Sequence, residues 1–210
     1  MTNANIIVID DFYDKPEEFR QWALGQEFIS EGNYPGIRTV DFAQDNEHWA
    51  EHIENHTTIE ICRDSWKDMA QNGAIQCIGA GAKTWIHADI SNEWSGVVYL
   101  NPDPPPMSGT SFYRHRRTGS LKYGDNVFGL EDTRILNHNG EGDDPHLNKW
   151  EVTDVVENRF NRLILFKAGL WHCQTNFTFF GKDKNDSRLT QTFFFNSTDW
   201  DGPNILEGYE

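Results

Sequence analysis

Basic side chains are scarce in this sequence, and their scarcity argues against two kinds of partner. The 210 residues include 18 Lys and Arg against 33 Asp and Glu, which gives a formal net charge of −15. Nucleic acids and anionic membrane surfaces select for clustered basic residues. The one basic cluster, Arg114-His115-Arg116-Arg117, is short, and it either meets an anionic substrate or forms an ordinary surface patch. We therefore expect neither nucleic acid nor a membrane as the main partner.

Cysteine is also sparse, and long apolar runs are missing. The three cysteines, Cys62, Cys77 and Cys173, are widely spaced and form no CxxC pair, which predicts buried thiols in a reducing compartment. No N-terminal stretch has the basic and apolar pattern of a signal peptide, and no apolar stretch approaches the ~18 residues of a membrane helix. Together these observations predict a cytoplasmic location.

Aromatic residues, in contrast, are plentiful. They make up 13% of the chain, with 14 Phe and 8 Trp, and this content predicts a folded chain with a sizeable core. We expect a single domain over residues 1–210, in which residues 1–72 form a helical N-terminal support and residues 73–200 form a β-rich core. Residues 102–160 include a proline-rich stretch and a long polar segment, which is either a functional loop or lid or a surface insertion.

Helical patterns are confined to the first third of the chain. A predicted strand over residues 5–12 precedes a helix that starts at Asp14, which has the spacing of a capping box with Glu17. Two further helices are predicted over residues 45–56 and 58–70. The last of these has apolar residues spaced by three and four, which would form a buried face: Ile59, Cys62, Trp66 and Met69.

Short β-rich stretches separated by turn residues dominate the rest of the chain. No helical patterns alternate with them, and this favours an antiparallel sandwich or barrel over a doubly wound sheet. The fold class is therefore expected to be mainly β with N-terminal helices. The predicted strands are residues 74–80, 83–90, 95–101, 110–115, 162–169, 171–180 and 187–196.

Two metal-binding side chains stand two residues apart in the second of these strands. His87 and Asp89 occupy positions i and i+2, so they would project from the same face of a strand. His172, which follows the apolar run Leu163–Phe166, is the candidate for a third ligand. Two histidines and one carboxylate on adjacent strands are typical of non-haem Fe(II) oxygenases. Trp85 shares the face of His87 and either walls the site or packs in the core.

An arginine and a threonine share one face of the last predicted strand. Arg188 and Thr190 are also two residues apart. A guanidinium can bind a carboxylate through two hydrogen bonds, and a neighbouring hydroxyl can add another. The pair therefore either anchors an anionic ligand or, if Arg188 meets one of the many acidic side chains, forms a structural ion pair.

The order of these motifs resembles a known family. His87-Ala88-Asp89 is followed by Tyr99-Leu100-Asn101, by Gly109-Thr110-Ser111-Phe112, by His172 and by Arg188-x-Thr190. This order is similar to that of the Fe(II)/2-oxoglutarate-dependent dioxygenases, and most of all to their prolyl-hydroxylase-like branch. Two features depart from the branch. His172 and Arg188 are sixteen residues apart, and prolines precede Gly109 where paired glycines are common.

The resemblance implies a fold, a site and a reaction. The implied fold is a double-stranded β-helix, the cupin-like jelly roll. Fe(II) would be bound by His87, Asp89 and His172, and the co-substrate 2-oxoglutarate would chelate the iron. Its distal carboxylate would pair with Arg188 and Thr190, and the Tyr99 hydroxyl would reach it. The implied reaction consumes O2 and 2-oxoglutarate, forms succinate and hydroxylates an amino acid, a peptide or another small molecule.

Other interpretations use the same residues. A metal-binding jelly roll without catalytic activity would have the same three ligands, and a zinc hydrolase could also use them. The first of these is the main alternative. A separate cluster, His48, His52 and His56, has the four-residue spacing of helical zinc ligands. Glutamates surround it, so a solvated polar face is the expected role.

Overall fold

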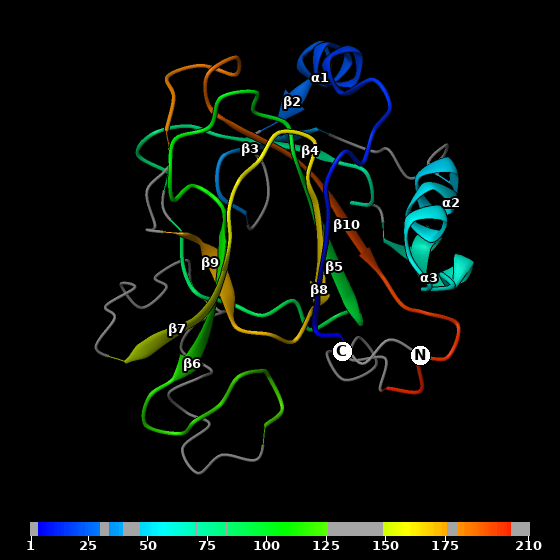
Figure 1. Cartoon of the computed structure of the whole chain (residues 1–210), viewed down its shortest axis with the longest axis vertical. Helices are drawn as coiled ribbons and strands as arrows, with labels where there is room; N and C mark the ends of the chain where they lie inside the picture. The colour runs from blue at the N-terminus through cyan, green and yellow to red at the C-terminus, as the bar shows by residue number, and fades with distance from the viewer. Residues whose placement is uncertain are drawn as a thin grey trace.

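The structure is a computed structural model that describes residues 4–29, 34–39, 47–69, 71–82, 84–125, 149–175 and 180–202. Its strands form one seven-stranded and one three-stranded antiparallel sheet. Figure 1 shows the small sheet (β6, β7, β9) on one side of the molecule and the central strands of the large sheet (β5, β8, β10) on the other. This arrangement confirms the predicted mainly-β jelly roll.

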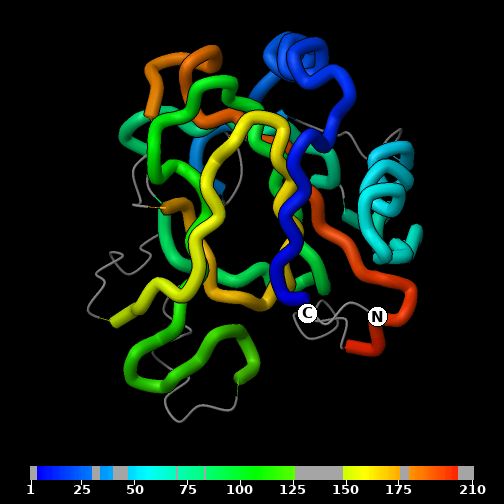
Figure 2. Tube along the Cα trace, in the orientation of Figure 1, coloured from blue at the N-terminus to red at the C-terminus, as the bar shows by residue number. Residues whose placement is uncertain are grey.

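The large sheet has the order β1-β8-β5-β10-β4-β3-β2 and the small sheet the order β7-β6-β9. Figure 2 shows that β1, near the N-terminus, runs beside β8, and the register pairs Ile6 with Phe166. The strand bounds in the large sheet are β1 Ile6–Ile9, β2 Phe28–Ile29, β3 Ile37–Thr39, β4 Ile75–Ile78, β5 Trp94–Tyr99, β8 Leu163–Lys167 and β10 Arg188–Phe195; those in the small sheet are β6 Thr110–His115, β7 Trp150–Val156 and β9 His172–Gln174.

The side chains of β10 alternate between the helical layer and the small sheet. Phe193 is fully buried and its ring stacks on Trp66 at a centroid distance of 5.7 Å, so the odd-numbered positions face the helices. Arg188 and Thr190 occupy the opposite face. The helices that cover the large sheet are α1 (Pro16–Leu24), α2 (Glu47–His56) and α3 (Arg63–Asp68). Among the described residues, no helix is long and apolar enough to cross a membrane.

The helical support differs from its prediction in three places. The capping box at Asp14 does not form: Lys15 is the N-cap because Pro16 takes the first helical position, and no side chain caps the helix. The third helix begins at Arg63 rather than at residue 58, because the preceding segment is extended and Ile61 pairs with Ser197. Two short strands, β2 and β3, were not predicted. They extend the large sheet beyond β4.

The β core differs in three places as well. Residues 84–90 form no continuous strand and contribute only an isolated bridge from His87 to His172. Strand β9 ends at Gln174, well before residue 180. Strand β7 lies within the polar segment that was expected to be either a loop or lid or a surface insertion. It is an edge strand, so polar residues such as Thr153 and Asp154 can stay exposed to solvent. Most of the expected loop or lid, residues 126–148, lies outside the described residues.

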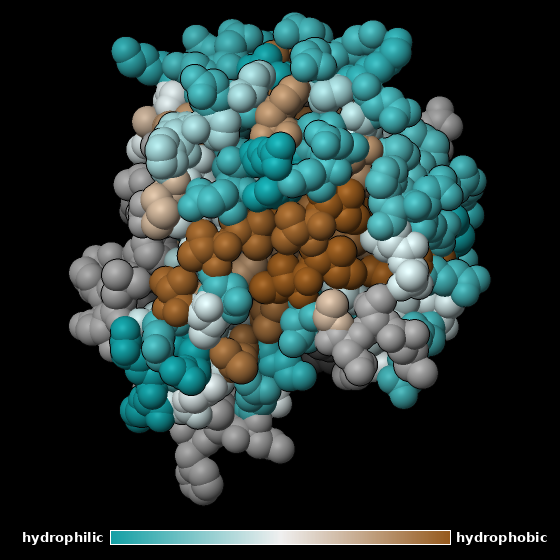
Figure 3. Space-filling view, viewed as in Figure 1, coloured by the Kyte–Doolittle hydropathy of each residue, from teal (hydrophilic) through white to brown (hydrophobic). Residues whose placement is uncertain are grey.

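An apolar area occupies the face of the molecule that carries β1 and β7. Figure 3 shows apolar side chains gathered over the region where Figure 1 draws these strands and β8. The exposed apolar residues of the two strands are Val8, Val152 and Val155. Both strands are edges of their sheets, so apolar side chains flank two open strand edges here.

Candidate functional site

The three predicted metal ligands lie together. His87, Asp89 and His172 each offer one ligand atom, and these atoms lie within 4.8 Å of one another. The His87 Nε2 atom is 3.8 Å from Asp89 Oδ1, and the His172 Nε2 atom is 3.6 Å from Asp89 Oδ2. Two imidazole nitrogens and one carboxylate oxygen at such spacings could hold a divalent metal ion. The donor set is the one that non-haem Fe(II) sites use.

Backbone hydrogen bonds hold the three ligands in place. The His87 N–H donates to the His172 carbonyl at 3.0 Å, and the His172 N–H donates back at 2.8 Å. The Asp89 N–H donates to the Ala168 carbonyl at 2.9 Å. Residues 84–90 therefore lie along β9 and the end of β8 without forming a regular strand, and the local bridge suffices to bring the side chains together.

Both imidazoles present the form that a metal requires. His87 Nδ1 donates to the Trp85 carbonyl at 3.1 Å, and His172 Nδ1 donates to the Leu170 carbonyl at 2.8 Å. These bonds leave each Nε2 with a free lone pair directed toward the site. Burial, and then the neighbouring His87, lower the pKa of His172 to about 4. His172 is therefore neutral near pH 7, as a metal ligand must be.

Ser95 orients the carboxylate of the site and was not predicted from the sequence. Its hydroxyl donates to Asp89 Oδ2 at 2.7 Å. Ser95 lies in β5 and is buried. Nothing local in the sequence links it to Asp89, because the contact depends on how the segment after Asp89 returns into β5.

Aromatic rings wall the site on one side. The Phe166 ring lies 4.5 Å from the His172 ring and 5.2 Å from the Phe112 ring, measured between centroids. Phe112 and Phe166 are buried. Trp85 lies on the more open side: its ring centroid is 6.3 Å from that of His87, and the residue is only half-buried. Trp85 is thus beside the site rather than in the core.

Arg188 is buried without a carboxylate partner. Only 6% of its surface is exposed, and Nε donates a long hydrogen bond, 3.4 Å, to the Ser108 carbonyl. The guanidinium carbon lies 5.5 Å from the centre of the Tyr99 ring. Burial lowers the pKa of Arg188, and no acidic side chain of the described residues forms an ion pair with it. The alternative of a structural ion pair therefore finds no support.

Thr190 and Tyr99 are two further buried polar residues on the same face as Arg188. The two residues are directly opposed in the register of β10 and β5, so they share the inner face. The Thr190 hydroxyl is buried and has no hydrogen-bond partner in the described part of the chain, whereas the Tyr99 hydroxyl shares a 2.7 Å hydrogen bond with Thr110. Gly109 allows the close approach of β6 to the chain after β7 because a Cβ there would lie 1.9 Å from the Val156 carbonyl oxygen.

The other histidine cluster does not form a metal site. His52 Nε2 donates to the Phe12 carbonyl at 2.6 Å, and its ring packs against Phe12 at 4.6 Å. His52 is therefore half-buried, and the expected solvated face was wrong at this position. Within the described part of the chain, the only group of three or more potential ligands is His87, Asp89 and His172.

The basic cluster on β6 makes its contacts on the small sheet. Arg114 forms an ion pair with Glu151 at 2.6 Å, and Arg116 Nε donates to the Trp150 carbonyl at 3.0 Å. Both partners belong to β7, the neighbouring strand. These contacts support the surface-patch interpretation of the cluster.

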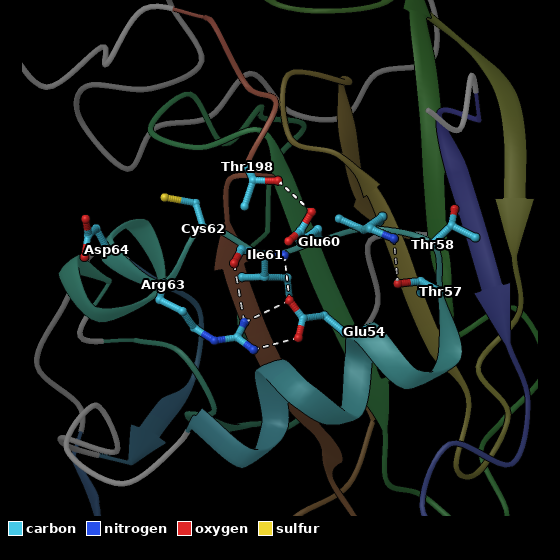
Figure 4. Close-up of a pocket in the computed structure, with 10 residues that line it drawn as sticks. Glu54, Thr57, Thr58, Glu60, Ile61, Cys62, Arg63, Asp64 and Thr198 are labelled. Carbon is cyan, nitrogen blue, oxygen red and sulfur yellow. Dashed lines mark hydrogen bonds and ion pairs between the residues drawn. The ribbon is translucent and has the colours of Figure 1, made fainter.

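A surface hollow of about 650 Å³ lies elsewhere, between the end of α2 and the start of α3. Figure 4 shows the Glu54 and Arg63 side chains pointing toward each other across it. Arg63 donates to both carboxylate oxygens of Glu54, at 3.0 and 2.6 Å, and the Ile61 N–H donates to the same carboxylate at 2.7 Å. Glu54 and Arg63 thus neutralise each other, and we assign the hollow a structural role.

Comparison with solved structures places the fold. HygX from Streptomyces hygroscopicus with nickel and 2-oxoglutarate bound has a TM-score of 0.57 at 12% identity, over 93% of this chain and 84% of HygX. Its complex with nickel, 2-oxoglutarate and hygromycin B scores 0.55 at 15% identity, over the same shares. A Trichoplax adhaerens prolyl hydroxylase with a hypoxia-inducible-factor peptide scores 0.53 at 11% identity, over 99% of this chain and 89% of the hydroxylase. The chain therefore has the jelly-roll fold of the Fe(II)/2-oxoglutarate oxygenases.

The sequence itself matches one family model. No curated protein matches this sequence. The model of a family of unknown function, DUF6445, matches residues 83–195. The matched segment contains His87, Asp89, His172 and the Arg188-x-Thr190 pair. Because the match spans more than half of the chain, the protein belongs to the DUF6445 family.

Proposed function

We propose that this protein is an Fe(II)- and 2-oxoglutarate-dependent oxygenase that hydroxylates an amino acid, a peptide or another small molecule. The proposal rests on two features of the same jelly roll. One is the set of ligand atoms of His87, Asp89 and His172, which lie within 4.8 Å of one another. The other is Arg188, which is buried without a carboxylate partner among the described residues.

Each side chain has a role in this proposal. His87, Asp89 and His172 would hold Fe(II), and Ser95 would orient the Asp89 carboxylate. Arg188 would bind the distal carboxylate of 2-oxoglutarate. The Thr190 hydroxyl, which has no hydrogen-bond partner among the described residues, would donate to the same carboxylate, and the Tyr99 hydroxyl would lie beside it.

The metal and the protein contribute different parts of the reaction. Bound Fe(II), with O2 and 2-oxoglutarate, would supply the oxidising power for hydroxylation, with succinate as a product. The protein would exclude water from one side of the site through the buried Phe112 and Phe166 rings. It would also fix the orientation of both imidazoles through the carbonyls of Trp85 and Leu170.

The substrate class is proposed from the ligands of two proteins with this fold. Among proteins with this fold, HygX was solved with hygromycin B and the Trichoplax hydroxylase with a peptide. A peptide or a small molecule is therefore the range that we propose for this chain.

The metal site is tested by anaerobic titration of Fe(II) and 2-oxoglutarate. We expect a metal-to-ligand charge-transfer absorption band and, once O2 is admitted, formation of succinate. His87→Ala should abolish both, whereas His48→Ala, on the exposed face of α2, should change neither. Turnover unchanged in His87→Ala would show that the site is elsewhere. Metal binding without the band or succinate would instead indicate a non-catalytic metal-binding jelly roll.

The co-substrate pocket is tested separately. Arg188→Met should weaken 2-oxoglutarate binding by at least ~10-fold, since a hydrogen-bonded charge is worth roughly 1.5–3 kcal/mol. Arg159→Met, at a largely exposed position, is the matched control and should leave the affinity unchanged. Equal affinities of the two variants would remove Arg188 from the pocket.

We also propose that residues 1–210 act as one domain in which residues 1–72 support the jelly-roll core of residues 73–200. The packing of Trp66 against Phe193 supports this division of labour. A cytoplasmic location remains our proposal and is supported by the cysteines, since Cys62, Cys77 and Cys173 are all free.

A further inference from the structure

A second arginine lies buried on the inner face of the large sheet. Arg38 of β3 is directly opposed to Gln76 of β4, and Gln76 is directly opposed to Thr190 of β10. Directly opposed residues of antiparallel strands project from the same face. The row continues to Tyr99, which is opposed to Thr190. Arg38 therefore projects from the same face of the large sheet as Thr190 and Tyr99.

Among the described residues, the groups in direct contact with the Arg38 guanidinium are neutral. One Nη donates to Gln71 Oε1 at 2.8 Å and the other to Gln76 Oε1 at 3.1 Å. The Tyr34 ring covers the guanidinium carbon at 4.3 Å. Only 8% of Arg38 is exposed, and its buried Nε–H has no hydrogen-bond partner among the residues that the structure describes. No carboxylate of the described residues forms an ion pair with it.

This environment is unfavourable for a permanent cation. Burial lowers the pKa of Arg38, while Tyr34 and the Asp89 carboxylate act in the opposite direction. Arginine nevertheless stays charged, and a buried charge without a counter-ion is costly. A carboxylate ligand would remove that cost and would accept a hydrogen bond from the free Nε–H.

The influence of Asp89 separates Arg38 from Arg188. Asp89 is one of the three potential metal ligands, and its charge reaches Arg38. The groups that act on Arg188 are Tyr99 and Cys173 instead. Strand β3 lies two strands away from β10 in the large sheet, so the two arginines occupy different positions on its inner face.

We propose that Arg38, with Gln76, binds a carboxylate of the substrate, so that the protein acts on a small carboxylate-bearing molecule. This inference rests on the proposed oxygenase function, because it assigns Arg188 to the co-substrate and Arg38 to the molecule that is hydroxylated. Tyr34 would hold the guanidinium plane, and the amides of Gln71 and Gln76 would fix its orientation before the substrate arrives.

The inference is tested by following the arginine Nε–H signals in ¹H–¹⁵N NMR spectra of the full chain. The protein is loaded with diamagnetic Zn(II) and saturated with 2-oxoglutarate, and acetate is the probe. The Arg38 and Arg188 signals are assigned with Arg38→Lys and Arg188→Lys, which keep the charge. We expect acetate to move the Arg38 signal along a saturable curve, while acetamide at equal concentration leaves it in place.

Chloride at matched ionic strength separates binding from screening. Equal shifts with acetate and with chloride would overturn the inference, as would an Arg38 signal that acetate does not move. Arg188→Met should retain the acetate response, because Arg38 is intact in that variant.

The titration of 2-oxoglutarate itself distinguishes the two proposals. If 2-oxoglutarate moves the Arg188 signal, the co-substrate assignment holds, and acetate then decides the role of Arg38 alone. If 2-oxoglutarate moves neither signal, the proposed function fails regardless of the acetate result. If 2-oxoglutarate moves Arg38 and not Arg188, Arg38 anchors the co-substrate and our inference is wrong.

Discussion

His87 and His172 exchange two backbone hydrogen bonds across an isolated antiparallel bridge, and their imidazole rings lie 4.3 Å apart. The site is therefore set by backbone pairing rather than by flexible side chains. The same two residues supply the bridge and two of the three potential ligands, so the backbone pairing fixes the spacing of the two imidazoles.

Removal of the Ser95 hydroxyl should weaken metal binding without unfolding the protein. Ser95 is the side chain that donates to Asp89 Oδ2, and the loss of an outer-shell partner typically costs ~10- to 100-fold in metal affinity. We expect this loss in Ser95→Ala, measured by calorimetric titration with Ni(II). Ser65→Ala is the control: its hydroxyl bonds backbone carbonyls near α3, so metal affinity should not change. Equal affinities in both variants would show that Ser95 has no role in the site.

Thr190→Val should separate stability from co-substrate binding. The Thr190 hydroxyl is fully buried and has no hydrogen-bond partner within the described ranges, so its removal should leave the ligand-free protein as stable as before or more stable. The affinity for 2-oxoglutarate should fall by roughly 2- to 12-fold, the value of one ordinary hydrogen bond. Thermal unfolding with and without 2-oxoglutarate measures both effects. A variant that is less stable without the ligand would mean that the hydroxyl is satisfied within the protein.

Acid should destabilise the contact between α2 and α3 through Glu54. Burial raises the pKa of Glu54, but Arg63 and the Ile61 N–H outweigh it, so the net pKa is lowered. The folded protein thus binds the Glu54 proton less readily than the unfolded chain, whose glutamate pKa is about 4.3. The stabilisation is complete above that pH and is lost as the pH falls through the lower, folded pKa.

Glu54→Gln should accordingly lower the free energy of unfolding by about 1 kcal/mol at pH 7. The difference from the parent protein should close as the pH is lowered below ~4, as measured by urea unfolding across the pH range. Glu60→Gln, in the same hollow (Figure 4) but without an arginine partner, is the control. A gap between Glu54→Gln and the parent that does not change with pH would exclude the ionic origin.

Phe193→Ala should destabilise the helical layer and the jelly roll together. Phe193 is fully buried and contacts Trp66 of α3 and Trp49 of α2. Large-to-small changes at buried phenylalanines cost about 3–5 kcal/mol. Fluorescence and circular dichroism should then report one shared, earlier transition. Two separate transitions would contradict the single-domain proposal. Val8→Ala, at an exposed position, should shift the transition little.

Residue types and their order were enough to predict much of this protein. Apolar runs with turns between them predicted an antiparallel sandwich or barrel, because strand periodicity is a local property, and the family resemblance implied the jelly roll. Strand periodicity also predicted that His87 and Asp89 project from the same face. The two side chains do lie together, but residues 84–90 form a single bridge and not a strand. Order along the chain then added His172, Arg188 and Thr190 as candidates.

Contacts set by strand register could not be predicted in this way. Ser95 reaches Asp89 only because of the path that returns the chain into β5, and β7 was missed because an edge strand may keep polar side chains on its exposed positions. Arg38 is the clearest case. Two registers, β3 with β4 and β4 with β10, place Arg38 in one row with Thr190. Thr190 is 152 residues away in the sequence.

The sequence by itself determined the chemistry of the ligands, because the nitrogen and oxygen donors are properties of the residues. The tertiary structure alone decided that Ser95 orients the Asp89 carboxylate and that Arg38 and Arg188 pair with no carboxylate of the described residues. Those features depend on the burial of one side chain among others brought from distant parts of the chain. Burial, in turn, is what makes an unpartnered hydroxyl or guanidinium costly and therefore informative.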